Sequence, residues 1–270
     1  MLPSACRHFP RVYLRDARGT LLTLSHFCPT AASLLLDTAP VMIVDAQPPL
    51  ALAEPIEGLD AREALPPLVR PGLLADTAGY GAWEEAVVRT FLDAPDADGA
   101  FHRIEQATEA IRRWSPSKGS LKAAVDAAFA VTTVAAIPTP RSVSLSRAFA
   151  IARELTGPHP LMEVPSDFER RWTRVHEAAE HAMRGPMARY LAASAFGNWI
   201  AYRGLGLRSI VEWLRACYDV VRVQMARTLS DYAVLGPQDL LESFRAADYI
   251  IVHTVDSQAF GRAAAEFEKD

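Results

Sequence analysis

Four side chains that could bind a metal ion lie within the first 28 residues of the chain. Cys6 and His8 stand two residues apart, and His26 and Cys28 repeat the pair in the opposite order. Residues two apart on a strand face the same side, so a hairpin folded about Ala17 would bring Cys6 opposite Cys28 and His8 opposite His26. Two thiolates and two imidazoles match the ligand set of a tetrahedral zinc site. The alternative is two core cysteines beside two surface histidines, since free cysteine often packs as a small hydrophobe.

Two short apolar runs are expected to position these four side chains. Residues 9–14 and 22–24 alternate apolar and polar side chains, and a turn-forming Asp-Ala-Arg-Gly sequence joins them. Pro29 predicts the start of a short helix over 30–36, because proline is tolerated in the first helical turn. A third apolar run at 41–44 predicts a further strand or an extended crossing.

The rest of the chain predicts a mainly α fold, a helical domain with a small N-terminal β-hairpin lobe. The hairpin lobe is expected over 1–45. Proline is frequent in the next segment, 46–78, which predicts a connector with at most a short helix over 60–65. Helical periodicity dominates from 79 to 270, which predicts an all-helical domain.

Local signals predict where several of these helices begin and end. Asp98 is the expected N-cap of a helix whose apolar stripe runs from Phe101 to Trp114. Ser166 and Glu169 predict a capping box for a helix that Gly185-Pro186 would end. Two further apolar stripes, over 207–225 and 240–251, predict long helices on either side of a Gly-Pro break.

Other candidate motifs favour structural roles. His176 and His181 resemble the paired histidines of zinc peptidases, but they are five residues apart and fall on different helix faces. Cys217 lies on the apolar side of its helix and is expected in the core. The aromatic residues of the C-terminal half have helical spacing that favours packing over a cofactor cage. The sequence contains no dinucleotide-binding glycine motif, no P-loop and no GxSxG nucleophile elbow.

Composition narrows the classes of partner and compartment. The formal net charge is −4, and lysine and arginine are spread along the chain, which argues against nucleic-acid binding. No apolar stretch reaches the roughly 20 residues that a membrane span needs. Three cysteines are too few for a disulfide scaffold, so we expect a cytoplasmic protein with its thiols reduced or bound to metal.

The N-terminal sequence carries a family resemblance. LPSACRHFPR resembles the closing part of the cysteine-cluster domain of YkgJ-type proteins, often described as zinc- or iron-chelating. In that family a Pro-x-x-Cys-Arg-x-Phe-Pro signature follows an upstream CxxCxxxCC motif. LLTLSHFCPTAASLLLDTAPVMI is similar to the segment that follows this signature in flagellin lysine-N-methylases. The helical segments 187–226 and 239–253 have the same order and apolar rhythm as theirs.

The resemblance implies a metal cluster and a methyl transfer reaction. In these methylases the cysteine cluster is thought to hold an iron–sulfur centre, and methyl groups pass to flagellin lysine side chains. Cys6 and Cys28 fall where the family has cluster-associated cysteines, whereas His8 and His26 do not. S-adenosylmethionine is a candidate donor, although its usual Gly-rich strand–helix site is missing. The upstream cysteine motif is also missing, so this form is expected to be N-terminally truncated.

Three functions therefore compete. The first is an iron–sulfur or zinc protein whose full-length form is a protein-lysine methyltransferase. The second is a non-catalytic helical interaction module with a structural zinc site at Cys6, His8, His26 and Cys28. The third is a helical protein without metal. The residues that would perform catalysis are not identified from the sequence.

Overall fold

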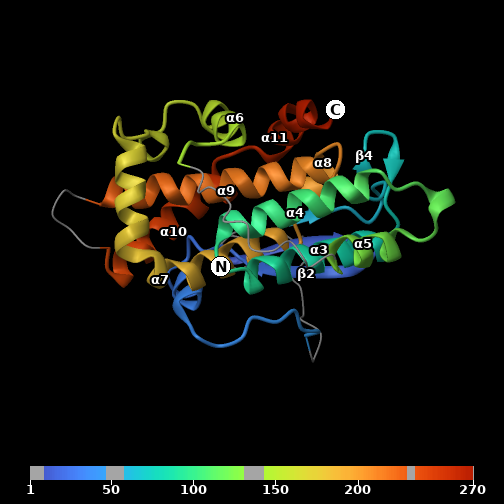
Figure 1. Ribbon diagram of the computed structural model, residues 1–270, viewed down its shortest axis with the longest axis horizontal. Helices are drawn as coiled ribbons and strands as arrows, with labels where there is room; N and C mark the ends of the chain where they lie inside the picture. The colour runs from blue at the N-terminus through green and yellow to red at the C-terminus, as the bar shows by residue number, and fades with distance from the viewer. Residues whose placement is uncertain (1–8, 47–57, 131–142, 230–234, 270) are drawn as a thin grey trace, which may run out of the picture.

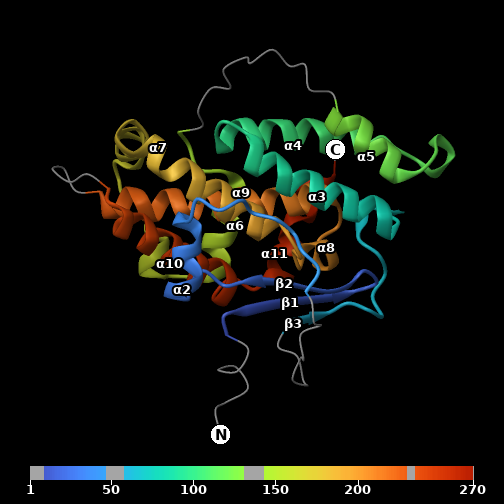
Figure 2. The same ribbon diagram turned by 90° about the horizontal axis from the view of Figure 1, so that it is seen from below.

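A computed structural model describes residues 9–46, 58–130, 143–229 and 235–269 of the chain. Helices make up most of these ranges, and a small sheet lies along one side of them (Figures 1 and 2). The predicted mainly α fold with a small N-terminal β lobe is confirmed.

A hairpin begins the described chain. Strand β1 (Arg11–Asp16) pairs antiparallel with β2 (Gly19–Leu24), so that Asp16 lies opposite Gly19. The centre of the hairpin turn therefore lies between Ala17 and Arg18, whereas the sequence predicts a turn centred on Ala17. Gly19 has a φ of 127°, a conformation that other residues rarely adopt. This shift moves every cross-strand partner by one residue.

The second strand ends before the predicted metal ligands. Ser25 closes the ladder through its N–H to Pro10 O at 2.7 Å, and the chain then turns into helix α2 (Pro29–Ser33). His26 lies in that turn, and Cys28 is the N-cap of α2. The prediction of a strand carrying both side chains on one face is wrong, because the helix that Pro29 starts ends the extended run.

The segment predicted as a connector contains short strands. Strand β3 (Gly58–Asp60) pairs in parallel with β1, and β4 (Leu68–Arg70) pairs with β5 (Leu73–Leu74) in a separate small sheet. A Cβ at Gly58 would lie 2.5 Å from Tyr13 O, so only glycine allows this approach of β3 to β1.

Residues that follow α2 do not form the expected third strand at 41–44. A 3-10 turn (Leu34–Leu36) continues the short helix as predicted, and the chain then runs without regular structure to residue 46. All four side chains from Val41 to Val44 are exposed. Without a neighbouring strand to bond their backbone, the apolar character of these residues does not suffice to form one.

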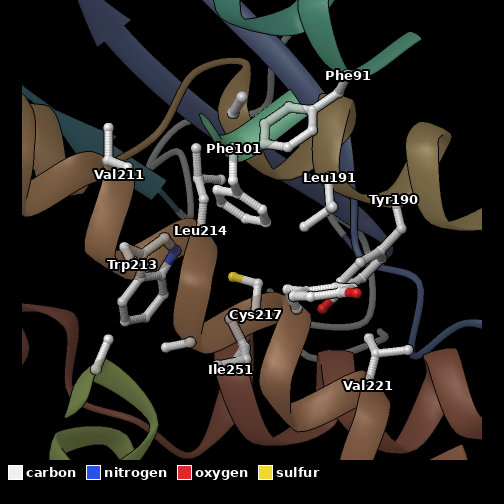
Figure 3. Packing of buried hydrophobic residues seen from close by; sticks show 14 of the residues in the cluster. Phe91, Phe101, Tyr190, Leu191, Val211, Trp213, Leu214, Cys217, Val221 and Ile251 are labelled. Carbon is white, nitrogen blue, oxygen red and sulfur yellow. The ribbon is translucent and has the colours of Figure 1, made fainter. Parts of the chain in front are cut away.

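Long helices form the body of the protein. In the described part of the chain after β5 these are α3 (Thr77–Asp93), α4 (Ala97–Arg112), α5 (Leu121–Ala130), α6 (Arg147–Thr156), α7 (Phe168–Ala195), α8 (Ile200–Arg203), α9 (Leu207–Thr228), α10 (Pro237–His253) and α11 (Ser257–Ala263), with 3-10 turns at Pro116–Lys118, Pro160–Met162 and Ala264–Glu268. Helix α9 is buried on nearly all sides, because α4, α6, α7 and α10 pack around it. Figure 3 shows this core, with Cys217 of α9 among Tyr190, Leu191 and Ile251.

Three predicted helix ends differ from the structure. Asp96, not Asp98, caps α4 and accepts a hydrogen bond from Gly99 N at 2.7 Å. Helix α7 begins after Asp167, whose carboxylate binds two nearby arginines instead of a capping N–H. The same helix continues through Pro186 to Ala195. An interior proline costs about 3 kcal/mol, and the packing of α7 against α3 and α9 offsets this cost.

Candidate functional site

Only half of the predicted metal site lies in the described residues. Cys6 and His8 are outside them. Cys28 is half-buried and forms no disulfide, and it begins α2 with its carbonyl bonded to Ala32 N. His26 is buried, with its ring 5.6 Å from that of Tyr190 and its Nδ1 3.9 Å from Asp248 Oδ1. Thus the imidazole of His26 packs against α7 and α10.

The turn that holds His26 and Cys28 is fastened to α10 through Asp248. Ser25 Oγ donates to Asp248 Oδ2 at 2.7 Å, and Phe27 N donates to the same oxygen at 3.0 Å. Arg245 Nε donates to Phe27 O at 3.1 Å. His253 Nε2 lies 2.9 Å from Ser25 Oγ. These bonds fix the backbone that presents Cys28.

The serine, histidine and aspartate of this turn are not arranged as a nucleophilic triad. A serine hydroxyl has one hydrogen, and Ser25 gives it to Asp248. His253 Nε2 must then act as the donor to Ser25 Oγ, whereas a triad needs the imidazole to accept the serine proton. Ser25 is also buried, so its hydroxyl serves structure.

At the other end of the hairpin, two buried carboxylates share one arginine. Arg18 donates to Asp16 Oδ2 and to Glu84 Oε2, each at 2.7 Å. Tyr202 OH donates to Asp16 Oδ2 at 2.9 Å, and Gly197 N donates to Glu84 Oε1 at 3.1 Å. Arg18 N completes the set by donating to Asp16 Oδ1. All four carboxylate oxygens therefore accept hydrogen bonds.

Burial shifts the protonation of this network. Burial raises the pKa of Glu84 above its ordinary value, although Arg18 and the Gly197 N–H act in the opposite direction. Burial lowers the pKa of Arg18, but its bonds to Asp16 and Glu84 outweigh that effect and leave the pKa raised. Burial, followed by the bond to Asp16, raises the pKa of Tyr202. These groups hold the hairpin turn against α3 and α8.

A cavity of about 90 Å³ lies between the hairpin and the ends of α7 and α10. Its walls are mainly apolar and include Leu24, Trp213 and Val252. Asp248 and His26 bring titratable groups to its surface. A mainly apolar cavity with a few convergent polar groups is the usual form of a small-molecule site.

A smaller cavity of about 40 Å³ lies between the start of α4 and α7. Asp98 and Trp172 line it. Burial raises the pKa of Asp98, while Arg222 and Arg215 lower it, and Arg215 lies 3.9 Å from its carboxylate. Because cationic side chains already face this acid, the cavity offers less to a charged ligand than the larger one.

The remaining sequence candidates have structural roles. His176 is buried and stacks on Trp172, whereas His181 is exposed, so the two histidines lie on different faces of α7 as predicted. Cys217 is fully buried, and burial raises the pKa of its thiol. Within the described ranges, no group of three or more His, Cys, Asp or Glu side chains is arranged to hold a metal ion.

Comparisons of the chain with protein-family models, curated proteins and solved structures give no match. Of the helices in the part of the chain that the structure describes, none combines the length and apolar character needed to cross a membrane. The site must therefore be interpreted from its own geometry.

Sequence reasoning missed Asp248 and Glu84, the buried acids at the two ends of the hairpin. A signal was present in each case. Asp248 interrupts the apolar stripe of α10 between Phe244 and Ile251, and Glu84 follows Trp83 on the buried side of α3. An acid on an apolar helix face predicts a buried partner, because an unpaired buried charge is costly. The identity of that partner depends on tertiary contacts.

Proposed function

We propose that this protein binds a metal ion or an iron–sulfur cluster, with Cys28 and Cys6 as thiolate ligands. The observation that carries the proposal is the position of Cys28 as the half-buried N-cap of α2, on a turn that Ser25 and Arg245 fasten to α10. A reduced thiol on a fixed backbone is a suitable metal ligand, because little conformational freedom is lost on binding.

The start of the described chain lies beside this turn. The ring of Phe9 is 6.3 Å from the ring of Phe27, next to Cys28. Cys6 precedes Phe9 by three residues, a reach of about 11 Å in an extended chain. The second thiol is therefore close enough in sequence to share a metal with Cys28.

The described residues alone do not fit a complete cluster. A four-iron cluster takes four thiolates, and within the described ranges only Cys28 offers an accessible one. The remaining donors must come from residues outside these ranges or from another chain. The packing of His26 against Tyr190 favours thiolate ligands over the alternative zinc site with two histidines.

The resemblance to flagellin lysine-N-methylases makes protein-lysine methylation the reaction class that we propose for the loaded protein. S-adenosylmethionine is the donor to test first, with a flagellin-like protein as acceptor.

Metal analysis of anaerobically purified protein tests the proposal. We expect about one equivalent of zinc or a stoichiometric iron content in the wild type, and its loss in Cys28→Ser and in Cys6→Ser. Cys217→Ala is the matched control and should keep its metal, because that thiol is in the core. Loss of metal in His8→Ala and His26→Ala would support the zinc alternative. A wild-type protein without stoichiometric metal, or a Cys28→Ser variant that retains it, would overturn the proposal.

A further inference from the structure

The cavity beside the hairpin contains a buried carboxylate with one unused oxygen. Asp248 is 3% exposed. Its Oδ2 accepts two hydrogen bonds, from Ser25 Oγ and Phe27 N. Among the described residues, no donor lies within hydrogen-bond distance of its Oδ1, and His26 Nδ1 lies 3.9 Å from this oxygen. This oxygen is not one of the fully buried side-chain atoms that lack a hydrogen-bond partner, so it keeps contact with the cavity that Asp248 lines.

The surroundings of Asp248 favour a cation at this position. Among the described residues that line the cavity, none is lysine or arginine, and Asp248 is the one acid. Arg245, one helical turn earlier on α10, is directed to Glu242 and Phe27 O instead. The described lining therefore combines one carboxylate with apolar walls and contains no lysine or arginine.

The walls determine the shape of a suitable ligand. Ile251 and Val252 of α10 form one side, and Trp213 of α9 forms another. Trp213 is fixed by an edge-to-face contact with Phe260 at 4.8 Å between ring centroids. The turn after α7 closes the cavity at Gly197, where a φ of 62° brings the backbone close to Leu21. These packed walls are preformed, which reduces the entropy lost when a ligand binds.

We infer that this cavity binds a small organic ammonium ion, with its charged head on Asp248 Oδ1 and its apolar body against Trp213 and Val252. An ammonium group would supply the donors that the carboxylate lacks, and a charge-assisted hydrogen bond is about twice as strong as a neutral one. The inference goes beyond the proposed metal site and does not depend on it.

Calorimetric titration with 3-methylbutylammonium tests the inference. At pH 8 this probe keeps its proton and therefore its positive charge. The isosteric alcohol, 3-methylbutanol, and the anion 3-methylbutanoate are the reference ligands. We expect a dissociation constant of about 1 mM or tighter for the amine. Binding of the alcohol should be at least about tenfold weaker, and the anion should not bind.

Two variants test separately the carboxylate that would bind the ammonium group and the apolar walls of the cavity. Asp248→Asn keeps an oxygen for Phe27 N but removes the charge, and we expect it to weaken amine binding at least about tenfold. Val252→Phe fills the cavity and should block the amine while the carboxylate remains intact. Glu242→Gln is the matched control, because it removes one negative charge from the same helix outside the cavity.

Each result either supports or overturns the inference. Equal binding of amine and alcohol would mean that the cavity recognises only apolar bodies. Absence of amine binding, or equal binding by wild type and the folded Val252→Phe variant, would also overturn it. Metal content is measured on the same samples. A wild-type protein that contains metal but does not bind the amine would contradict this inference alone, and a wild-type protein that binds the amine but contains no metal would contradict the metal proposal alone.

Discussion

Both ends of the β1–β2 hairpin carry a buried carboxylate network, but only one of them is complete. At the turn, Asp16 and Glu84 share Arg18, and every carboxylate oxygen accepts a hydrogen bond. At the open end, Asp248 holds the turn before Cys28 with one oxygen and leaves the other at a cavity. The difference separates a structural contact from a candidate binding site. A saturated network can only hold the fold, whereas an unsaturated one can still accept a ligand.

A second comparison shows that environment, not local sequence, creates the complete network. Asp16-Ala17-Arg18 recurs as Asp60-Ala61-Arg62. In both, the arginine turns back to the aspartate two residues earlier. The first pair is buried against Glu84 of α3, whereas the second pair is about half exposed. Identical tripeptides should therefore differ greatly in their contribution to stability.

The largest expected effect follows from removal of the arginine at the turn. Arg18→Met leaves two buried carboxylates without a countercharge, and we expect a loss of about 3–5 kcal/mol in the free energy of unfolding. Urea denaturation measures it. Arg62→Met, in the exposed copy of the tripeptide, should cause little change. Similar losses in the two variants would show that burial does not distinguish them.

Loss of the hydroxyl at the open end should have an intermediate effect. Ser25→Ala removes a hydrogen bond to Asp248 Oδ2 and leaves Phe27 N as the remaining donor to that oxygen. We expect a loss of about 1–2 kcal/mol, because a bond to a charged group is removed from a buried site. Denaturation of Ser25→Ala with Ser33→Ala as a surface control gives this value. A loss as large as that of Arg18→Met would contradict the view that the open end contributes less to stability.

The matching change at the turn should have a smaller effect. Tyr202→Phe removes the hydroxyl that donates to Asp16 Oδ2, but Arg18 still bonds both oxygens of that carboxylate. We expect a loss of about 0.5–1 kcal/mol, measured by the same denaturation. A larger loss than in Ser25→Ala would reverse the comparison, since it would make the saturated end the more sensitive one.

Glu84→Gln is expected to change the free energy of unfolding least, and the change depends on pH. Burial raises the pKa of Glu84 in the folded state above 4.5, so the folded protein binds this proton more tightly than the unfolded chain. Stability from this group is present below that value and falls as pH rises through the folded pKa. The glutamine variant lacks this decline and should gain stability relative to the wild type as pH rises from 4.5. Thermal unfolding across this range measures the trend, and an opposite slope would contradict the assigned direction.

The sequence predicts the helices well and the chemistry poorly. Apolar stripes such as that of α10 place a helix correctly, because burial of one face is a local property of spacing. Pro29 likewise predicts α2. Strand β3 is not predictable in the same way, because it exists only through its pairing with β1.

The candidate site shows the same limit. Cys28 and His26 stand out by residue type, but their orientation depends on where β2 ends and α2 begins. Asp248 has one free oxygen because Ser25 and Phe27 both donate to the other one, and these two residues lie more than 200 positions away in the chain. Hydrogen bonds over such separations are set by tertiary packing, so spacing in the sequence does not reveal them.

Carbon-13 NMR of protein labelled at the aspartate carboxyl carbons, titrated with 3-methylbutylammonium, tests most directly the difference between the two ends of the hairpin. We expect a saturable shift of the Asp248 resonance and no shift of the Asp16 resonance, because of these two carboxylates only Asp248 has an oxygen left to bind. Equal shifts of both resonances, or an unchanged Asp248 resonance, would contradict this expectation.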